Sequence, residues 1–570
     1  MNIKLTTLPM LATFATCILP ATSVAERGSD GDLNIIYWQA PTMLNPYLSS
    51  GPKDIEPASL VLEPLARYDE TGNLVPWLAT EIPTQANGGI SEDLTTVTWK
   101  LSPDLTWSDG SPFTAHDVVF TSKYCMTAEG GCQQATKFNN ISTVEALDDL
   151  TVKITFDAPK PFPYAPFVGV ETPILQKAQF DGCMGDKAPT CTAENFGPIG
   201  TGPFRVADFR SGDVAVFKAN PNYRDPNKPA FETVTIKGGG DAIGAARAVL
   251  GTGEMDYAWN LQVDPAVLNA MAEGGAGQVI RSFSTAVERM MINRSNPSAE
   301  LGDARSTTAG GAHPFLTDPA VLSAMSLAID RTTVSDLGYG TAGKPTCDIL
   351  PAPAIYASSA NDACLTQDLE QANKLLTDAG WIDEDGDGVR EKDGVRLSIL
   401  FQTSTNPVRQ DTQALLKDWW SQIGIETELR HIDPSVFFGG DQASPDTFQK
   451  FYADVQMFTN FFPGTDPEAY LNNWTCAKIP SPDNNWLGFN IPRYCTAEYD
   501  ALAKTLAQTS ALEERAAIAR QMNDMLMQAG ALIPLVHRGD VSAQSNTLEG
   551  VRMNSWDSEL WNIADWSRAK

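Results

Sequence analysis

The chain has few of the residues from which catalytic sites are usually built. It holds only four histidines among 570 residues, and none of them lies in an H-E-x-x-H zinc motif. A G-x-S-x-G turn, which carries the serine nucleophile of many hydrolases, is also absent. Two carboxylates could still cleave glycosidic bonds, but among 70 acidic residues nothing marks one pair out. We expect no enzyme and keep a hydrolase as the alternative.

Positive charge is scarce as well. The chain has 41 Lys and Arg residues against 70 Asp and Glu residues, which gives a net charge of −29 at pH 7. Phosphate backbones and anionic membrane surfaces repel such a protein. We therefore expect no nucleic-acid partner. The simplest role of the negative charge is to keep the protein soluble.

Long apolar runs are missing except near the N-terminus. Lys4 precedes a short apolar stretch from Leu8 to Leu19, and Ser23-Val24-Ala25 supplies the small residues of a signal-peptidase site. Residues 1–25 are thus predicted to be a signal peptide that is cleaved after Ala25, which places the protein in the periplasm. The alternative, a lipid anchor on Cys17, fits less well because the residues before this cysteine depart from the usual lipoprotein pattern.

Removal of residues 1–25 leaves eight cysteines. No two of them have C-x-x-C spacing and no histidine lies nearby, so a zinc site is not indicated. Eight cysteines allow 105 connectivities. We predict the four pairs that each close one local loop, in keeping with an oxidising compartment; they are Cys125–Cys132, Cys183–Cys191, Cys347–Cys364 and Cys476–Cys495.

The segment from Thr96 to Thr121 has a readable local pattern. Apolar and polar residues alternate up to Lys100, which predicts a half-buried strand. Ser108-Asp109-Gly110 then predicts a turn. Thr114 followed by Asp117 predicts a capped helix start. Strand, turn and helix together describe a scaffold element, and strands alternate with helices along the rest of the chain, so we expect the α/β class.

Several motifs resemble one protein family when taken in order. They are Trp107-Ser108-Asp109-Gly110, Pro112 to Phe120, Gly200-Thr201-Gly202-Pro203-Phe204, Asn220-Pro221-Asn222-Tyr223, Gly253-Glu254-Met255-Asp256 and Asp318 to Arg331. This series resembles the family 5 extracellular solute-binding proteins, which are the peptide-, dipeptide-, nickel- and opine-binding components of bacterial ABC importers. One departure is Ser323, which stands where that family usually has arginine.

The resemblance implies a bilobal periplasmic-binding-protein-like fold, with two mixed-sheet lobes, an extra subdomain in lobe I and two inter-lobe crossings. The implied division assigns residues 26–67 to lobe I, 68–197 to the insertion subdomain, 198–288 to lobe I, 289–534 to lobe II and 535–570 to lobe I.

The resemblance also implies a function. The protein would capture an oligopeptide or a peptide-like solute and deliver it to the transmembrane subunits of an ABC permease, as a monomer and without a required cofactor. An oligosaccharide or an opine is the alternative ligand. An exported hydrolase is the alternative from another class, and a surface protein that uses the fold without transport is the third.

Candidate ligand contacts follow from the family's architecture, in which ligands lie beyond the carboxyl ends of strands. Aromatic residues could enclose a ligand, and amides or an arginine could bind its polar groups. For each single residue, a role in the core or at the surface is an equally good explanation. The candidates are Trp38, Thr42, Asn45, Trp259, Asn260, Asn293, Arg294, Thr459, Asn460, Phe461 and Phe462.

The run from Asp383 to Gly388 matches the first half of a calcium-binding loop. Asp383, Asp385 and Asp387 would supply carboxylates, Val389 its carbonyl, and Glu391 would replace the glutamate that is missing at the last position, where Gly394 stands; Asp393 is the other substitute. This interpretation predicts a structural Ca²⁺. The alternative is a solvated Asp/Gly turn that binds nothing.

Overall fold

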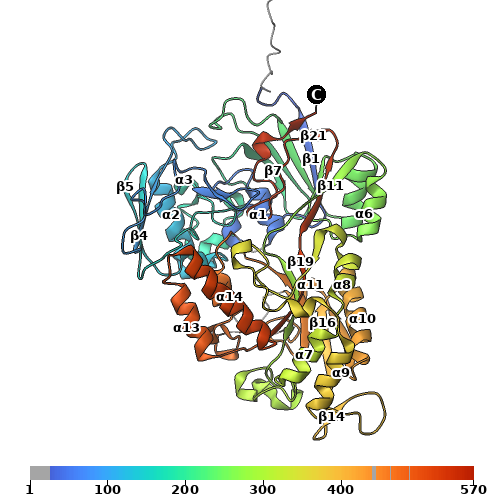
Figure 1. The fold of residues 1–570 in the computed structure, drawn as a ribbon. Coiled ribbons are helices and arrows are strands. Elements are labelled where there is room, and N and C mark those ends of the chain that lie inside the picture. Colours follow the sequence, from blue (N-terminus) through green and yellow to red (C-terminus); the bar gives the residue numbers. More distant parts are fainter. Residues whose placement is uncertain are drawn as a thin grey trace, which may run out of the picture.

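Two mixed β-sheets, one above the other in Figure 1, form the framework of the protein. The computed structural model describes residues 26–49, 51–438, 444–462, 464–484, 486 and 488–569. The predicted signal peptide and Cys17 lie outside these residues. None of the helices in the described ranges combines the length and the apolar character that a membrane span needs.

The upper sheet has seven strands in the order β11-β20-β10-β1-β9-β8-β7. Its central strand β1 is parallel to both neighbours, β9 and β10. Helices α5 (Ala242–Ala246) and α6 (Pro265–Ala272) pack on one face, and the C-terminal segment contributes Leu560 and Trp566 to the core of the other. The strands are β1 (Asp32–Tyr37), β7 (Phe204–Arg210), β8 (Val214–Ala219), β9 (Thr233–Gly238), β10 (Tyr257–Ala258), β11 (Gly277–Ser282) and β20 (Asp540–Ser545).

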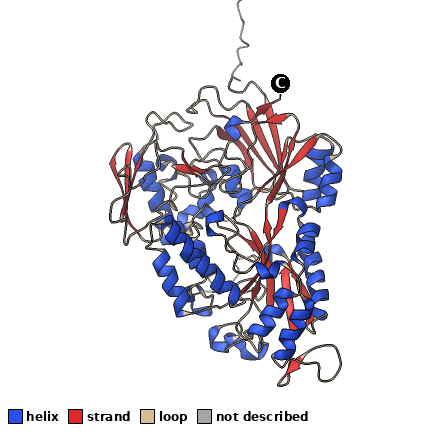
Figure 2. Cartoon of the chain, in the orientation of Figure 1, coloured by secondary structure: helices blue, strands red, loops and turns tan. Residues whose placement is uncertain are grey.

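The lower sheet has six strands in the order β13-β19-β12-β18-β16-β17. Figure 2 shows helices on both sides of it. One face packs on α7 (Pro319–Leu327), α8 (Arg331–Gly338), α9 (Leu369–Asp378) and α10 (Pro407–Ser421), and the other packs on α13 (Ala497–Leu506) and α14 (Leu512–Gln528). The strands are β12 (Val287–Ile292), β13 (Gly343–Pro345), β16 (Ser398–Ser404), β17 (Glu426–Ile432), β18 (Val455–Asn460) and β19 (Leu532–Arg538).

A third core surrounds a three-stranded sheet, β4 (Thr96–Lys100), β5 (Ile141–Asp148) and β6 (Thr151–Phe156), beside the upper sheet. The predicted strand and capped helix are confirmed as β4 and α2 (Ala115–Met126). The Asp117 carboxylate accepts the Thr114 backbone N–H at 3.0 Å. The remaining α-helices and strands are α1 (Pro52–Ala58), α3 (Lys177–Phe180), α4 (Thr192–Phe196), α11 (Pro434–Phe437), α12 (Glu468–Asn472), β2 (Ala66–Tyr68), β3 (Leu74–Pro76), β14 (Glu391–Lys392), β15 (Val395–Arg396), β21 (Leu548–Glu549) and β22 (Ser567–Arg568).

Two short crossings join the large sheets. The first, residues 283–286, connects β11 to β12, and the second is Gly539, between β19 and β20. The predicted boundaries at 288/289 and 534/535 fall inside β12 and β19, so each crossing is misplaced by a few residues. The reason is that these apolar strands continue to pair within the lower sheet up to the crossing, so their sequence carries no break there.

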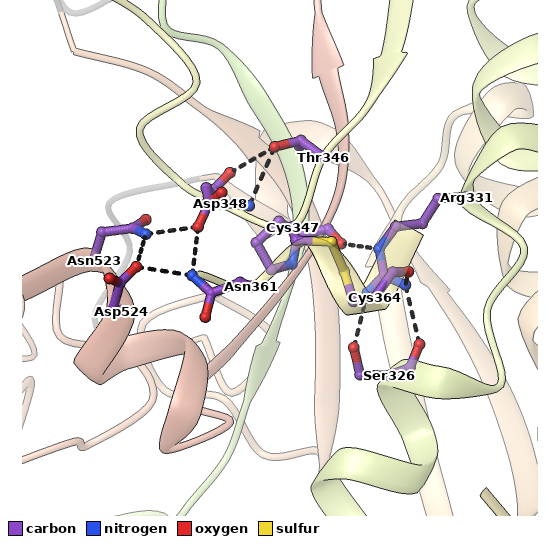
Figure 3. Close-up of a disulfide and its surroundings, with 10 residues drawn as sticks. Ser326, Arg331, Thr346, Cys347, Asp348, Asn361, Cys364, Asn523 and Asp524 are labelled. Carbon is purple, nitrogen blue, oxygen red and sulfur yellow. Dashed lines mark hydrogen bonds between the residues drawn. A yellow bond between two sulfur atoms is a disulfide. The ribbon is translucent and has the colours of Figure 1, made fainter. Parts of the chain in front are cut away.

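The four predicted disulfides are confirmed. Figure 3 shows that the Cys347–Cys364 bridge holds a loop between two helices. Arg331 of α8 donates a hydrogen bond to the carbonyl oxygen of Cys364 at 2.8 Å. Asn361 donates to the carboxylate of Asp524 in α14 at 2.9 Å. The bridge therefore helps to fasten one side of the lower sheet to the other.

Replacing Cys347 and Cys364 together by serine is expected to lower the free energy of unfolding. The bridge spans 17 residues, and closing a loop of that size is worth about 3 kcal/mol in the chain-entropy model. Urea denaturation of the purified variant and the parent protein measures the difference. An unchanged midpoint would show that the loop is held by its hydrogen bonds alone.

Candidate ligand-binding site

A cavity lies between the two large sheets, beside the crossings. The space free of atoms at this cavity amounts to about 650 Å³, open solvent included. The strands β10 and β16 both end near it, in agreement with the rule that ligands lie beyond the carboxyl ends of strands. Its lining is Leu261, Gln262, Val263, Pro265, Leu268, Asn269, Val279 and Arg281 from above, Glu288, Gly338, Tyr339, Thr341, Ala342, Asn406, Val408 and Arg409 from below, and Arg538, Gly539 and Val541 at the second crossing.

A buried ion pair forms the lower wall of this cavity. Arg409, in the first turn of α10, donates to both carboxylate oxygens of Glu288 at 2.9 and 3.3 Å. Tyr339 donates a further hydrogen bond to Glu288 at 3.2 Å. Burial alone would raise the pKa of the Glu288 carboxyl, but the charge and hydrogen bonds of Arg409 outweigh it and hold that pKa below its ordinary value. Glu288 is therefore ionised, and Arg409 is already neutralised.

Contacts between the lobes flank the cavity. Asn406, which caps the N-terminus of α10, donates to the side-chain oxygen of Gln262 at 3.1 Å. Gly340 has a φ of +53°, and a Cβ on it would lie 2.7 Å from the ring of Pro265, so the two segments meet closely. On the other side of the crossings, Lys160 pairs with Glu468 at 2.7 Å.

Three predicted ligand residues lie next to this cavity. The indole N–H of Trp38 donates to the backbone oxygen of Asn260 at 2.8 Å, and the Asn260 side chain accepts a hydrogen bond from Gln262 of the lining at 3.4 Å. The hydroxyl of Thr459 donates to the carboxylate of Glu288. The structure thus brings strand-end residues of both lobes together, and their contact with a ligand stays a prediction.

Two predicted amides are structural instead. Asn45 and Asn293 are both fully buried. The Asn45 amide donates to Asn195 at 2.8 Å, and the Asn293 amide donates to the carbonyl of Ala453 at 2.9 Å. Because their side chains satisfy backbone and core groups, the prediction that they contact a ligand is corrected.

Two predicted aromatic contacts are also part of the core. Trp259 is 3% exposed, stacks on Tyr37 and donates its indole N–H to Glu56 at 3.1 Å. Phe462 is 5% exposed and packs on Tyr470. An aromatic residue at a strand end can be buried or exposed, and the sequence does not distinguish the two cases. The predicted ligand role of Trp259 and Phe462 is therefore corrected.

The other predicted contacts are spread over the surface of the lobes. The backbone N–H of Thr42 binds Asp54 at 2.6 Å at the start of α1. Arg294 is half-buried and donates to a backbone carbonyl just after α14 at 2.7 Å, and its role in binding a carboxylate stays a prediction. The carbonyl oxygen of the Asn460 side chain accepts the N–H of Phe461, whose ring is 48% exposed. Asn460 and Phe461 remain predictions.

The sequence did not point to most of the charged residues of the cavity. Asn406 and Arg409 follow the carboxyl end of β16 directly, so the rule for strand ends could have found them. Arg281 and Arg538 lie on strands beside the crossings and have no local signal of their own. Only the tertiary structure, which places both strand ends at one cavity, identifies them.

The predicted calcium loop is only partly assembled. The carboxylates of Asp383, Asp385 and Glu391 lie within 4.8 Å of one another. Asp387, however, forms a salt bridge with Arg396 at 2.7 Å. The backbone N–H of Val389 donates to the same Asp387, which closes a solvent-exposed turn. The geometry is that of the Asp/Gly turn named as the alternative, and nothing else at the loop supports a bound Ca²⁺.

Comparison with known proteins identifies the family that this architecture is typical of. The model of the bacterial extracellular solute-binding proteins, family 5 Middle, matches residues 73–481. The oligopeptide-binding protein AppA of Bacillus subtilis is 24% identical over 561 residues, covering 96% of this chain and 93% of that protein.

The expected bilobal α/β fold is confirmed by two solved structures. AppA in complex with a nonapeptide has a TM-score of 0.75 at 21% identity, covering 96% of this chain and 100% of AppA. NikZ from Campylobacter jejuni in complex with Ni(L-His) has a TM-score of 0.75 at 23% identity, covering 94% and 99%.

Proposed function

The chain belongs to the bacterial extracellular solute-binding proteins of family 5, and we propose that it captures a peptide or a peptide-like solute between its lobes for delivery to an ABC permease. The observation that carries this proposal is the cavity between the two sheets, which both lobes and one crossing line. A ligand held there touches both lobes at once. Binding of such a ligand can therefore change the relative position of the two lobes.

The two crossings give this proposal a mechanism. Only residues 283–286 and Gly539 connect the large sheets in the described parts of the chain, so the lobes can rotate about a narrow hinge. A ligand shifts the equilibrium towards the closed state only by the difference between its affinities for the closed and open states. Asn406 and Gln262 join the two lobes in this structure, and any contact of this kind that forms only on closure adds to that difference.

A peptide is the favoured ligand class because the cavity combines apolar walls with amide side chains. Leu261, Val263 and Leu268 could receive an apolar side chain. Gln262 and Asn406 bond to each other, and the second N–H and the second lone pair of each amide could serve peptide groups. The name of AppA points to an oligopeptide in that protein, whereas the NikZ structure is a complex with nickel and histidine. An opine or an oligosaccharide stays the alternative for this chain.

The remaining features are part of the proposal. The family is one of solute-binding proteins, and we propose that this chain catalyses no reaction and needs no cofactor. It is exported by residues 1–25, which are removed, and acts in the periplasm as a monomer together with its permease. Steady turnover of a glycoside or peptide substrate by the purified protein would favour the hydrolase alternative instead.

A bound ligand is expected to stabilise the protein. At a ligand concentration of 100 times Kd, the free energy of unfolding rises by about 2.7 kcal/mol. Thermal denaturation with pools of synthetic tetrapeptides, opines and oligosaccharides measures the shift. Native mass spectrometry of the freshly purified protein identifies any ligand that it retains. If oligosaccharides raise the melting temperature and no peptide pool does, the peptide proposal is wrong.

A further inference from the structure

An ion pair joins the third core to the lower lobe. The third core lies to the left of the upper sheet in Figure 1, above α13 and α14. Lys160 Nζ is 2.7 Å from a carboxylate oxygen of Glu468, the first residue of α12. The backbone N–H of Lys160 donates to the carbonyl oxygen of Leu94 at 2.7 Å, which fixes Lys160 on the third core. The two paired side chains are 22% and 14% exposed, so salt screens this pair less than a pair on the open surface.

Glu468 depends on Lys160 for most of its counter-charge. Among the described residues one other cation reaches Glu468, namely Arg515 of α14, at 3.5 Å. The guanidinium of Arg515 already binds the carboxylate of Asp466, at 3.0 Å from Nε and 2.7 Å from Nη2. Arg515 is therefore shared between two acids, and Lys160 makes the shorter contact with Glu468.

The surfaces on either side of this ion pair pack closely. Gly464 has a φ of +71°, and a Cβ on it would lie 2.8 Å from the hydroxyl oxygen of Tyr68, whose ring belongs to the third core. A Cβ on Gly72 would lie 3.2 Å from the methyl group of Thr465. The third core thus contacts the lower lobe at Gly464 and Thr465 as well as at Glu468.

The course of the chain leaves this contact free to break. Only the two crossings connect the large sheets in the described parts of the chain. Thr285 in the first crossing exchanges two hydrogen bonds with the backbone of Phe462, at 2.7 and 3.0 Å, so the end of β18 is fixed to the hinge and moves with the lower lobe. A rotation about the crossings can therefore separate Glu468 from Lys160 without breaking a strand pairing.

We propose that Lys160 and Glu468 form a latch that holds the two lobes closed in the absence of a ligand. The third core, rather than the cavity, then supplies part of the free energy of closure. A ligand that binds the closed arrangement has less of this free energy to supply, so its apparent Kd is lower. The latch rests on the hinge of the proposed function but not on the class of the ligand.

Small-angle X-ray scattering of the mature protein, freed of retained ligand by dialysis from urea, measures closure. The parent protein should match the curve calculated from this structure. Lys160→Met keeps the apolar stem and removes the charge. A hydrogen bond to a charged group changes an equilibrium about tenfold, so the ratio of closed to open protein should fall by that factor and the radius of gyration should increase. Lys100→Met is the matched control, because it removes a Lys–Glu pair with Glu81, at 3.1 Å, that does not join the lobes.

Reversal of the charges separates the role of charge from that of packing. Lys160→Glu places two acids together and should open the lobes further than Lys160→Met does. Adding Glu468→Lys restores a pair of opposite charges and should return the scattering curve towards that of the parent protein. Circular dichroism checks that each variant is folded.

Each outcome decides the inference. An open parent protein overturns the latch, and so does a Lys160→Met variant that is as compact as the parent protein. Opening of Lys100→Met to the same extent would show that the effect is not specific to Lys160, and the inference would be wrong. If Lys160→Met opens but the reversed pair does not close again, packing holds the lobes and the latch is overturned. If one of the two Lys160 variants fails to fold, the other decides. The proposed function stands in all these cases, because the ligand screen tests it separately.

Discussion

Replacing Arg67 by methionine is expected to cost about 3 to 5 kcal/mol of stability, because it leaves a buried carboxylate without its partner. The Arg67 and Asp557 side chains are 1% and 0% exposed, and Arg67 Nη1 lies 3.0 Å from an Asp557 carboxylate oxygen. Burial raises the pKa of the Asp557 carboxyl, and the charge of Arg67 opposes this rise. Methionine keeps the apolar stem of the side chain, so the loss measures the missing charge.

The double variant Arg67→Met with Asp557→Asn is the control. An asparagine at position 557 can still accept the backbone N–H of Tyr68, which Asp557 accepts at 3.1 Å. With both charges gone, the double variant should be more stable than Arg67→Met alone. Urea denaturation of the parent protein, the two single variants and the double variant gives the coupling energy between the two side chains. The loss of stability in Arg67→Met should also shrink as the pH falls, because protonation of Asp557 removes the unpaired charge. A loss below about 1 kcal/mol at neutral pH would contradict the prediction.

The sequence predicted the scaffold well because scaffold signals are local. The capping residues Thr114 and Asp117 lie three positions apart, and each cysteine pair closes a short loop, so both can be recognised without knowing the fold. Helix α9 (Leu369–Asp378) is followed by Gly380 at positive φ, which is a local signal of the same kind. Such features depend only on neighbours in the chain.

The candidate site was predicted less well because the residues of the cavity come from distant parts of the chain. Trp38, Asn260 and Thr459, which the rule for strand ends suggested, lie beside residues that line one cavity, and their contact with a ligand stays a prediction. Asn45 and Asn293 obey the same rule, yet their amides serve buried backbone groups. A strand-end position restricts where a side chain lies, but it does not say whether that side chain faces the cleft or the core.

Buried charges were the least predictable feature. Glu56 is separated from Asp540 and Glu559 by most of the chain, and none of the three has a sequence signal that distinguishes it from the other acids. In the fold they lie together under the second crossing, where each raises the pKa of a neighbour. Only tertiary packing creates this cluster, and it has a consequence for how stability depends on pH.

Stability is expected to fall as the pH rises because of this cluster. Burial, and secondarily the charge of Asp540, raises the pKa of Glu56 to about 8, and burial raises the pKa of Glu559 strongly as well. In the unfolded chain both groups ionise near their ordinary pKa values. Between about pH 4.5 and pH 8 the folded protein thus holds more protons than the unfolded chain. For each extra proton that the folded protein holds, the free energy of unfolding falls by about 1.4 kcal/mol for every unit by which the pH rises in that range.

Glu559→Gln should remove part of this dependence. Glu559 accepts hydrogen bonds from the hydroxyls of Tyr257 and Ser542, and the carbonyl oxygen of glutamine can accept both. The variant is expected to match the parent protein near pH 4.5 and to exceed its free energy of unfolding by a margin that grows as the pH rises towards 8. Urea denaturation across this range measures both curves. Glu549→Gln, at an exposed position on β21, is the control and should follow the parent protein. If the Glu559→Gln curve runs parallel to that of the parent protein, the carboxyl of Glu559 is ionised in the folded state, and the raised pKa is wrong.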